Sequence, residues 1–294
     1  VKELPFDLKN MPDIFTEFRK LIESKKIIVK APTPLPEKLP PLPDKNIEFS
    51  SNTNFPTSLK YKHASFPYLE NQFYGGEKNA LAHLENYLIK KLPHTYKETR
   101  NQLYGVNFST KFSPWLSLGS ISARYIAFRI KEFEDQHGAN ESSYWIWFEL
   151  LWRDYFRFIH FKFGKKLYSK NGLSHNNNLP SHNDENFNRW IQGETGNSLI
   201  DAGMKELRFT GYLSNRMRQI VASYLIYDLG CDWRKGALWF ESQLIDYDVY
   251  SNQGNWLYIA GLGTDPRGGR KFNTNKQNLE YDPNNTYKKM WLNR

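Results

Sequence analysis

Apolar side chains recur at intervals of three and four residues along most of the chain, from about residue 76 to the carboxyl end. This spacing is typical of amphipathic α-helices. Helices are expected at residues 76–91, 120–136, 142–162, 183–191, 198–208, 215–229, 233–260 with a break, and 283–291. The alternating pattern of strands is almost absent, and no long repeat of the kind found in solenoids is present. The pattern therefore predicts an all-α fold with a single helical domain.

Residues with capping preferences lie at several of the predicted helix ends. Helices are expected to begin after Ser120, Ser214 and Asp232 and at Asp282 with Pro283, whereas Gly230 is expected to end one. These local signals agree with the periodic pattern, so the two kinds of evidence support the same helical prediction.

The amino-terminal part of the chain has a different pattern. Residues 12–24 have apolar side chains on one face and Pro12 at a favoured first helical position, which predicts a short amphipathic helix. Residues 31–43 contain six of the fifteen prolines, and such a run forms neither a helix nor a central strand. We therefore expect residues 1–60 to form a helix and a proline-rich linker, and residues 61–294 to form the helical domain.

Aromatic residues make up 16% of the chain, so the core is expected to be rich in rings. Such an interior suits a flat ligand, although plain packing is the commoner reason for it. Lys and Arg exceed Asp and Glu by 40 to 31, which gives a net charge of +9. A basic excess favours an anionic partner such as nucleic acid, but many basic proteins bind none.

Cys231 is the only cysteine, which excludes a disulfide within the chain and a zinc or iron–sulfur site with several cysteines. No metal site is therefore expected. No apolar run reaches the length of a membrane-spanning helix, and the first residues lack the features of a signal peptide. These observations predict a soluble, cytoplasmic protein without a membrane partner. The chain begins with Val rather than Met, which fits a piece of a longer protein.

Residues 244–261, LIDYDVYSNQGNWLYIAG, place several polar side chains within an otherwise aromatic, helix-like segment. If Asp246 lies on the buried face of a helix, Val249, Tyr250 and Gln253 share that face. A buried carboxylate needs a partner that satisfies its charge. The segment therefore raises the question of what partner Asp246 has.

Two other constellations could carry chemistry. Glu149, Trp152, Arg153 and Phe156 fall on one stripe of the helix expected at 142–162. The stripe is either an internal salt bridge beside core aromatics or the floor of a pocket for a planar ligand.

The second constellation is at the start of the helix expected at 215–229, where Asn215 and Arg218 follow the Ser214 cap. The helix dipole opposes an arginine there, so an anion is expected nearby, either Asp246 or a phosphate. The loop FSTKFSPWLSLGS, residues 108–120, is rich in hydroxyl groups. It is either a phosphate-binding loop or a set of ordinary turns.

Taken together, these segments resemble a known family. FTGYLSNRMRQIVASYLIYDLGCDWRKGALWFESQLIDYDVYSNQGNWLYIAG, WFELLWRDYFRF, STKFSPWLSLG and YDPNNTYKKMWL are similar to the flavin domain of photolyases and cryptochromes. The opening LPFDLKNMPDIFTEFRK and the proline-rich segment resemble the cryptochrome DASH class in particular. The resemblance runs from about residue 5 to the end of the chain.

The resemblance implies that FAD is the cofactor. It implies contacts to the phosphates and ribose from Tyr96 and from the loop residues Ser109, Thr110, Lys111, Phe112 and Ser113. It places Glu149 and Arg153 between flavin and substrate, and it pairs Arg218 with Asp246 beside the isoalloxazine, with Asp248 nearby and Asn252 facing the flavin nitrogen N5. Since an amide cannot supply a proton as a carboxylic acid can, Asn252 is not expected to protonate N5.

The resemblance also implies roles in electron transfer and in substrate binding. Trp190, Trp233 and Trp256 match the family's relay, which passes electrons from the surface to the flavin. Arg100, Trp152, Asn215 and Arg216 match positions that contact DNA, and Glu149, Asn215 and Asn252 are the expected catalytic residues. Conventional photolyases have Trp and Met where this chain has Tyr258 and Gln219 in the substrate pocket. These two polar replacements reduce the stacking area, which favours single-stranded DNA because extruding a base from a duplex is costly.

The expected function is therefore an FAD-dependent, light-driven lyase that splits the carbon–carbon bonds of cyclobutane pyrimidine dimers in DNA. The alternative is a blue-light photoreceptor or nucleic-acid-binding regulator without repair activity. Family members also carry an amino-terminal α/β antenna domain, and nothing in this chain has its alternating strand and helix pattern. This chain is accordingly expected to lack that domain and to hold no antenna chromophore.

Overall fold

The fold is entirely helical in the part of the chain that the computed structural model describes, residues 4–25, 29–34, 36–38, 40–41, 64–67, 70–174 and 181–293. No strand occurs among these residues, which confirms the all-α prediction. The α-helices are α1 (Phe15–Ser24), α2 (Glu77–Ile89), α3 (Tyr96–Thr99), α4 (Ser113–Ser117), α5 (Ala123–His137), α6 (Glu141–Phe163), α7 (Asp184–Gln192), α8 (Ser198–Thr210), α9 (Asn215–Tyr227), α10 (Trp233–Gln243), α11 (Val249–Ala260), α12 (Thr274–Tyr281) and α13 (Thr286–Leu292). Short 3₁₀ helices are η1 (Leu8–Asn10), η2 (Asn71–Phe73), η3 (Leu92–Thr95) and η4 (Gly164–Tyr168). No described helix is both long and apolar enough to cross a membrane.

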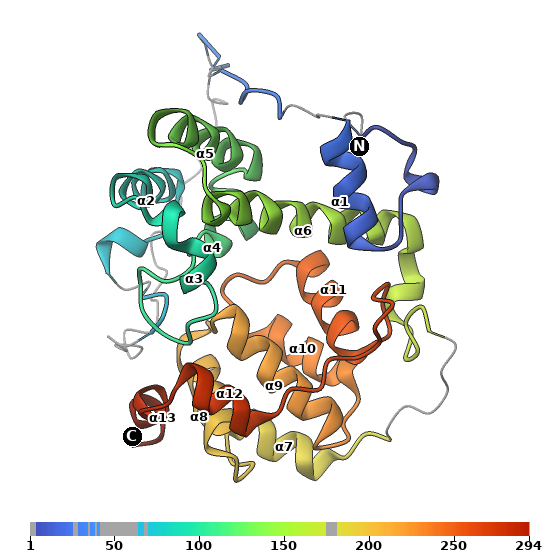
Figure 1. The fold of residues 1–294 in the computed structure, drawn as a ribbon. Helices are drawn as coiled ribbons and strands as arrows, with labels where there is room; N and C mark the ends of the chain where they lie inside the picture. Colours follow the sequence, from blue (N-terminus) through green and yellow to red (C-terminus); the bar gives the residue numbers. More distant parts are fainter. Residues whose placement is uncertain are drawn as a thin grey trace.

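Helix α6 organises the molecule because it packs against both halves (Figure 1). Its first turns join an apolar cluster with α2, α3, α4 and α5, and its later turns join a larger cluster with α1 and α7 to α11. Helix α11 lies closely against α6 at Gly254, where a Cβ atom would be 2.2 Å from the ring of Phe156. The site described below lies where the two clusters meet.

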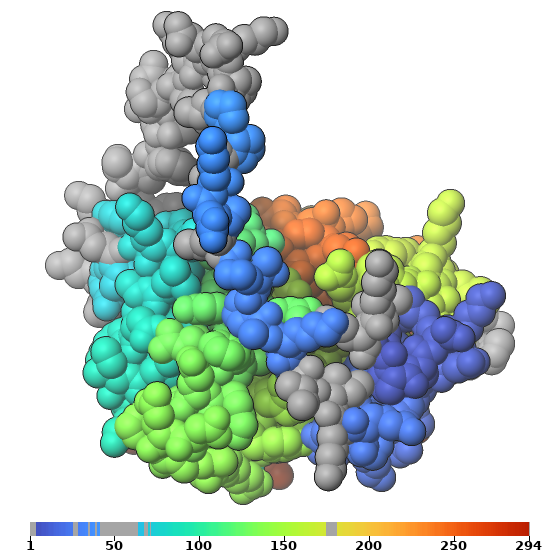
Figure 2. Space-filling view, turned by 90° about the horizontal axis from the view of Figure 1, so that it is seen from above, coloured from blue at the N-terminus to red at the C-terminus, as the bar shows by residue number. Residues whose placement is uncertain are grey.

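The amino-terminal helix is shorter than predicted. Helix α1 begins at Phe15, after an extended Ile14, so Pro12 precedes the helix and does not occupy its first turn. Phe15, Phe18 and Ile22 are buried, and Figure 2 shows α1 at the surface beside the green and yellow-green α6. The described parts of the proline-rich segment form neither helix nor strand, as expected. The predicted boundary near residue 60 lies outside the described residues.

Some predicted caps are confirmed and others are wrong. The Ser214 hydroxyl accepts from the Met217 amide and the Asp232 carboxylate accepts from the Arg234 amide, so both residues cap the predicted helices. The cap of α5 is Ser122 instead of Ser120.

The ends assigned to Gly230 and Asp282 also differ. Helix α9 ends at Tyr227, so Gly230 lies beyond it with a left-handed φ of 64°. Helix α13 begins at Thr286, and Asp282 reaches it from four residues upstream by accepting from the amides of Tyr287 and Lys288.

The break predicted within residues 233–260 determines where Asp246 lies. Helix α10 ends at Gln243 and α11 begins at Val249, whose cap is Asp248. Asp246 is therefore in the turn between two helices, and the shared helical face with Val249, Tyr250 and Gln253 does not form. Its carboxylate is nevertheless buried, with a side chain 1% exposed.

Candidate functional site

A cavity of about 640 Å³ opens between the two apolar clusters, within the range expected for a cofactor or substrate site. Its walls come from the start of α1, the loop before α4, helices α6, α9 and α11, and the loop that follows α11. A smaller compartment of about 80 Å³ adjoins it and shares Asn215, Arg218, Gln219, Asp246 and Asp248 with the main cavity. The two volumes therefore form one site with an inner end and a mouth.

The loop predicted to bind phosphate lines this cavity. Ser109 and Lys111 have left-handed φ values of 60° and 56°, which are uncommon for residues other than glycine. The loop is held by His83, whose Nε2 donates to the Thr110 carbonyl oxygen over 2.9 Å. Phe112 does not line the cavity, because its ring packs in the core against His83 and Tyr87. It acts as the anchor of the loop.

The side chains of Ser109, Thr110, Lys111 and Ser113 line the cavity together with the buried Tyr96 at the start of α3. Lys111 is 3% exposed and forms no ion pair with any described residue. Burial lowers the pKa of its amine to about 8, although the carboxylate of Glu206 opposes the shift. This wall of the main cavity therefore offers hydroxyl groups and a buried cation without an ion pair among the described residues, which fits an anionic ligand.

Arg218 and Asp246 answer the question raised by the polar segment 244–261. Nη2 of Arg218 donates to both carboxylate oxygens of Asp246 over 3.0 and 2.8 Å, and its Nε donates to the Leu213 carbonyl oxygen over 2.9 Å. Both side chains line the main cavity and the smaller compartment. The predicted pair is therefore present, at the wall between the two volumes.

The acid and the base on the α6 stripe do not pair with each other. Glu149 pairs with Arg100, whereas Arg153 donates to Asp248 over 3.0 Å and to the Leu116 carbonyl oxygen over 3.3 Å. Glu149 and Arg153 both line the cavity. Of the two explanations for the stripe, the pocket floor is therefore the one that the structure supports. Burial raises the pKa of Glu149, although Arg100 opposes this shift.

Most residues expected on the substrate side gather at the mouth. Arg100, Trp152, Asn215, Gln219 and Tyr258 line the cavity. Arg216 does not line it, because its guanidinium lies 5.6 Å from the ring of Phe272 and 5.2 Å from that of Tyr281. It forms no ion pair with the described residues, so its charge remains available to an anion outside the cavity.

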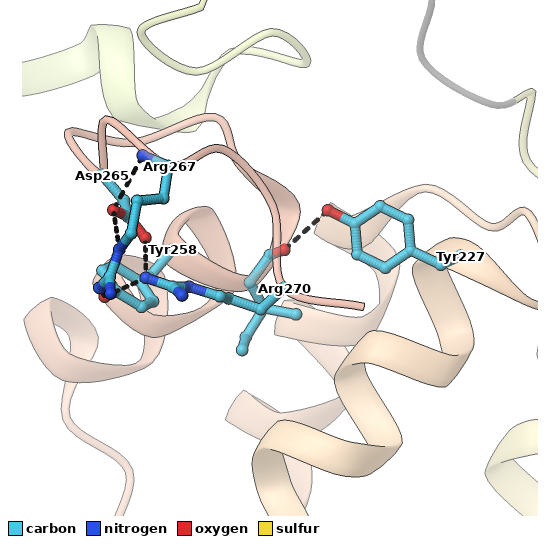
Figure 3. A network of polar contacts seen from close by, with 6 residues as sticks. Tyr227, Tyr258, Asp265, Arg267 and Arg270 are labelled. Atoms are coloured by element: carbon cyan, nitrogen blue, oxygen red, sulfur yellow. Dashed lines mark hydrogen bonds and ion pairs between the residues drawn. The ribbon is translucent and has the colours of Figure 1, made fainter. Parts of the chain in front are cut away.

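Tyr258 belongs to a polar network on the rim of the mouth (Figure 3). Its hydroxyl accepts from Arg267 over 3.0 Å and from Arg270 over 2.8 Å, and the Arg270 guanidinium lies 4.9 Å from the centre of its ring. Both arginines also pair with Asp265, whose side chain is 3% exposed. Asp265 and Arg267 line the cavity, although neither residue was predicted from the sequence. The signal was available, since an acid and two arginines follow the helix of Tyr258 within a few residues.

Asn252 lies at the inner end of the site. It lines the smaller compartment, and its Nδ2 donates to the Ala237 carbonyl oxygen over 3.0 Å. The amide is therefore held in one orientation by α10. Asp248, which caps α11, lines both volumes, and its carboxylate accepts a hydrogen bond from Arg153.

The three tryptophans of the expected relay are all buried. The ring centres of Trp190 and Trp256 are 6.4 Å apart, and Phe240 lies 6.2 Å from the first and 5.1 Å from the second. Trp256 lines the smaller compartment, and Trp233 lies one turn before Gly236, on which Trp256 packs. Trp190, Trp233 and Trp256 are 0%, 3% and 2% exposed, so none of the three supplies an exposed surface end for an electron path.

A buried carboxyl next to the cavity predicts a measurable pH dependence. Burial raises the pKa of Glu206 to about 7, although hydrogen bonds from Tyr287 and Ser65 oppose the shift. A carboxyl whose pKa is higher in the folded than in the unfolded state adds stability below its unfolded pKa and loses that contribution as the pH rises. We expect the Tm of the ligand-free protein to fall by about 5 °C between pH 5 and 8 through this group.

The measurement is a thermal melt at several pH values on the wild type and on Glu206→Gln. The glutamine cannot ionise, so the variant should lack this part of the decline. An identical pH dependence in the two proteins would show that Glu206 keeps the same protonation state throughout that range.

Comparisons with known proteins show which proteins this chain is similar to. Residues 145–294 match the family described as the FAD binding domain of DNA photolyase. The cryptochrome DASH of Synechocystis sp. is 47% identical over 294 residues, which cover 99% of this chain and 59% of the relative. The solved structure of Synechocystis sp. PCC6803 cryptochrome has a TM-score of 0.84 and 44% identity, over 99% of this chain and 60% of that chain.

A photolyase from Sulfolobus tokodaii, solved with two FAD molecules, has a TM-score of 0.59 and 31% identity, over 75% of this chain and 47% of that chain. The chain thus spans less than two thirds of the length of each of these three proteins. The likeness to the two Synechocystis proteins nevertheless covers 99% of this chain, which includes the elements that build the cavity.

Proposed function

The chain belongs to the photolyase and cryptochrome family, and from this premise we propose that it forms the active part of a light-driven lyase that splits cyclobutane pyrimidine dimers in DNA. One observation carries the proposal: a single cavity has one wall with hydroxyl groups and a buried amine that suit a large anionic cofactor, and a mouth with aromatic and basic side chains. Dimers in single-stranded DNA are the proposed substrate. The relatives are longer than this chain, so we propose the activity for the whole protein to which this chain corresponds.

FAD is the cofactor of this domain, and the residues present fit it. The buried Lys111 amine and the hydroxyls of Ser109, Thr110 and Ser113 would hold the phosphates, because they line the cavity together and the amine has no ion pair among the described residues. The Arg218–Asp246 pair and Asn252 would hold the isoalloxazine at the smaller compartment. When bound and reduced, the flavin supplies a light-driven electron to the substrate.

The chain's own groups would position the substrate and control protons. Glu149, whose pKa burial raises against the opposing charge of its partner Arg100, would in its protonated form donate a hydrogen bond to a pyrimidine carbonyl oxygen. Asn215, exposed at the start of α9, would contact the same base from the other wall. Asn252 offers only an amide, so it would orient its ligand without giving up a proton.

Electron supply from the protein is proposed to run through the ring cluster beside the smaller compartment. Trp256 would be its inner member, with Trp190 and Trp233 as candidates for the next step. Because all three rings are buried, the path to the surface must use a further group or a short opening of the structure.

The mouth supports a preference for single strands. Tyr258 is tied to two arginines by its hydroxyl, and Gln219 is polar, so the mouth offers less apolar stacking area than Trp and Met would. Extruding a dimer from a duplex costs a few kcal/mol that stacking must offset. A single strand avoids most of that cost. Arg216, outside the cavity, would contact the phosphate backbone.

The test is a repair assay with protein that carries reduced flavin. Oligothymidylate with one cyclobutane dimer, as a single strand and in a duplex, is illuminated with blue light, and thymine recovery is measured by absorbance. We expect light-dependent recovery in the single strand and a rate lower by about tenfold or more in the duplex. The control is the same mixture kept in the dark. The proposal fails if illumination restores thymine in neither substrate.

A blue-light photoreceptor or nucleic-acid-binding regulator is the second candidate function. The same polar mouth favours it, since the Tyr258 network reduces the stacking surface on which repair depends. Light-dependent bleaching of the bound flavin without any loss of dimers would support this candidate. An intracellular location is proposed for either function, because the only cysteine, Cys231, is buried and unpaired.

A further inference from the structure

We propose that Tyr155, one of the residues that line the cavity, is a positioning residue for the dimer site, acting through the two edges of the mouth; this inference rests on the proposed function. Two segments far apart in sequence frame the mouth of the cavity, Ile14–Thr16 at the start of α1 and Thr264–Arg267 after α11. The Tyr155 hydroxyl, on α6, forms hydrogen bonds to both sides: to the Asp13 carbonyl oxygen and to the Thr264 hydroxyl. One buried group therefore joins the two edges of the mouth.

The surroundings of Tyr155 make it suitable as a fixed tie. Its side chain is 1% exposed, and its ring centre lies 5.4 Å from that of Phe15 and 5.5 Å from those of Phe18 and Trp152. Burial raises the pKa of its hydroxyl, so the group stays protonated and can donate at any physiological pH. The packed ring fixes where the hydroxyl points, and the hydroxyl fixes the distance between the two segments.

The position of α1 also determines how Trp152 meets a ligand. Phe15 stacks on Trp152 with ring centres 3.7 Å apart and planes 12° from parallel. Tyr258 meets Trp152 edge-on at 5.6 Å. One face of Trp152 is therefore covered by α1, and a base can use only what remains of the ring. A shift of α1 or of the 264–267 loop would change both the width of the mouth and the stacking surface.

The hydrogen bonds of Tyr155 should control how well the site distinguishes a strand with a dimer from an undamaged strand. Contacts to backbone phosphates position any strand, damaged or not, and they do not depend on the width of the mouth. Admission of two linked pyrimidines requires a mouth of defined width with Trp152 and Tyr258 correctly placed. Loosening the mouth should therefore weaken binding of a dimer more than binding of an undamaged strand.

The same helix offers a matched control. The Tyr144 hydroxyl bonds Glu23 over 2.7 Å and Arg19 over 2.6 Å, so it ties the far end of α1 to α6. Tyr144 does not line the cavity. Tyr144→Phe removes a hydroxyl group that ties α1 to α6 away from the mouth. Tyr155→Phe removes the hydroxyl group that joins the two edges of the mouth.

The experiment measures dissociation constants by fluorescence anisotropy, for single-stranded oligothymidylate with and without one cyclobutane dimer, on flavin-loaded protein. The ratio of interest is the Kd for the undamaged strand divided by the Kd for the strand with a dimer. We expect Tyr155→Phe to lower this ratio by about three- to tenfold, which is the effect of losing neutral hydrogen bonds. Thr264→Val, which removes the other hydroxyl, should have the same effect, and the double variant should be no worse than the single ones. Tyr144→Phe should keep the wild-type ratio.

Each other outcome has a definite meaning. A wild-type ratio in Tyr155→Phe and Thr264→Val, or an equal fall in Tyr144→Phe, overturns the inference. Wild-type protein that does not distinguish the two oligonucleotides contradicts the proposed function itself, and this is seen before any variant is made. Flavin content and Tm are measured on every protein. If Tyr155→Phe does not fold, Thr264→Val decides the question.

Discussion

Replacing Asp246 by alanine should give protein that retains no flavin and is less stable by about 3–5 kcal/mol. The reason is the state of its partner. The carboxylate accepts two hydrogen bonds from Arg218 and its side chain is 1% exposed, while the Arg218 side chain is 23% exposed, on the wall of the cavity. Without Asp246 the guanidinium remains largely buried with no counter-charge. Flavin absorbance after purification and a denaturant titration measure the two effects.

Two further variants separate stability from binding. In Arg218→Met with Asp246→Leu, both charges are replaced by apolar side chains, which usually restores the stability lost by breaking a buried pair. We expect this double variant to recover stability but not flavin. Asp265→Ala removes a carboxylate that is also buried, at 3% exposed, but whose partner Arg267 is 69% exposed at the mouth, and this variant should keep its flavin. Recovery of flavin in the double variant would mean that the pair serves the fold alone.

The helical fold could be predicted because its evidence is local. The periodic pattern and caps such as Ser214 and Asp232 depend on neighbouring residues, so they can be interpreted without a structure. The helices that the pattern missed, α3, α4 and α12, are at most eight residues long, too short to establish a periodicity. The cap of α5 is Ser122 and not Ser120 because two serines only two positions apart give equivalent local signals.

The partners of the charged residues could be predicted only in part. The Arg218–Asp246 pair followed from the family resemblance, and the structure has it. The i, i+4 spacing of Glu149 and Arg153 allowed a pair on α6, but each side chain found a partner on another element, Arg100 and Asp248. Competition among several partners is a tertiary effect, and spacing along one helix contains no information about it.

The contacts that shape the mouth of the cavity were even less predictable from the sequence. Phe15 and Trp152 stack although 137 residues separate them, and Tyr155 bridges residues from opposite ends of the chain. No local pattern marks either contact, since Phe15 reads as an ordinary apolar position of an amphipathic helix. Residues that line a site from a distant segment are therefore the part of a functional site that a single sequence hides.

Lys111→Met should have effects of opposite sign on stability and on cofactor binding. The ammonium is 3% exposed and has no ion pair among the described residues, and burial lowers its pKa to about 8. A lysine whose pKa is lower when folded destabilises the protein at neutral pH, and this cost declines as the pH rises above about 8 and is gone only above the pKa of the unfolded lysine. Methionine has similar length and no charge, so the ligand-free variant should have a Tm higher by about 2 °C or more at pH 7. The same change should weaken FAD binding by about ten- to a hundredfold, the worth of a hydrogen bond to a charged group.

Titration calorimetry with FAD at several pH values, together with melts of the ligand-free protein, tests both effects. Wild-type affinity should fall as the pH rises through about 8, because the amine loses its proton, whereas the affinity of Lys111→Met should not. Lys97→Met is the control, since Lys97 pairs with Glu141 outside the cavity and should change neither quantity. The competing explanation is that the Lys111 amine serves the fold as the counter-charge of the buried Glu206. In that case Lys111→Met lowers the Tm and leaves the FAD affinity as it was, so the sign of the stability change alone distinguishes a ligand-binding cation from a structural one.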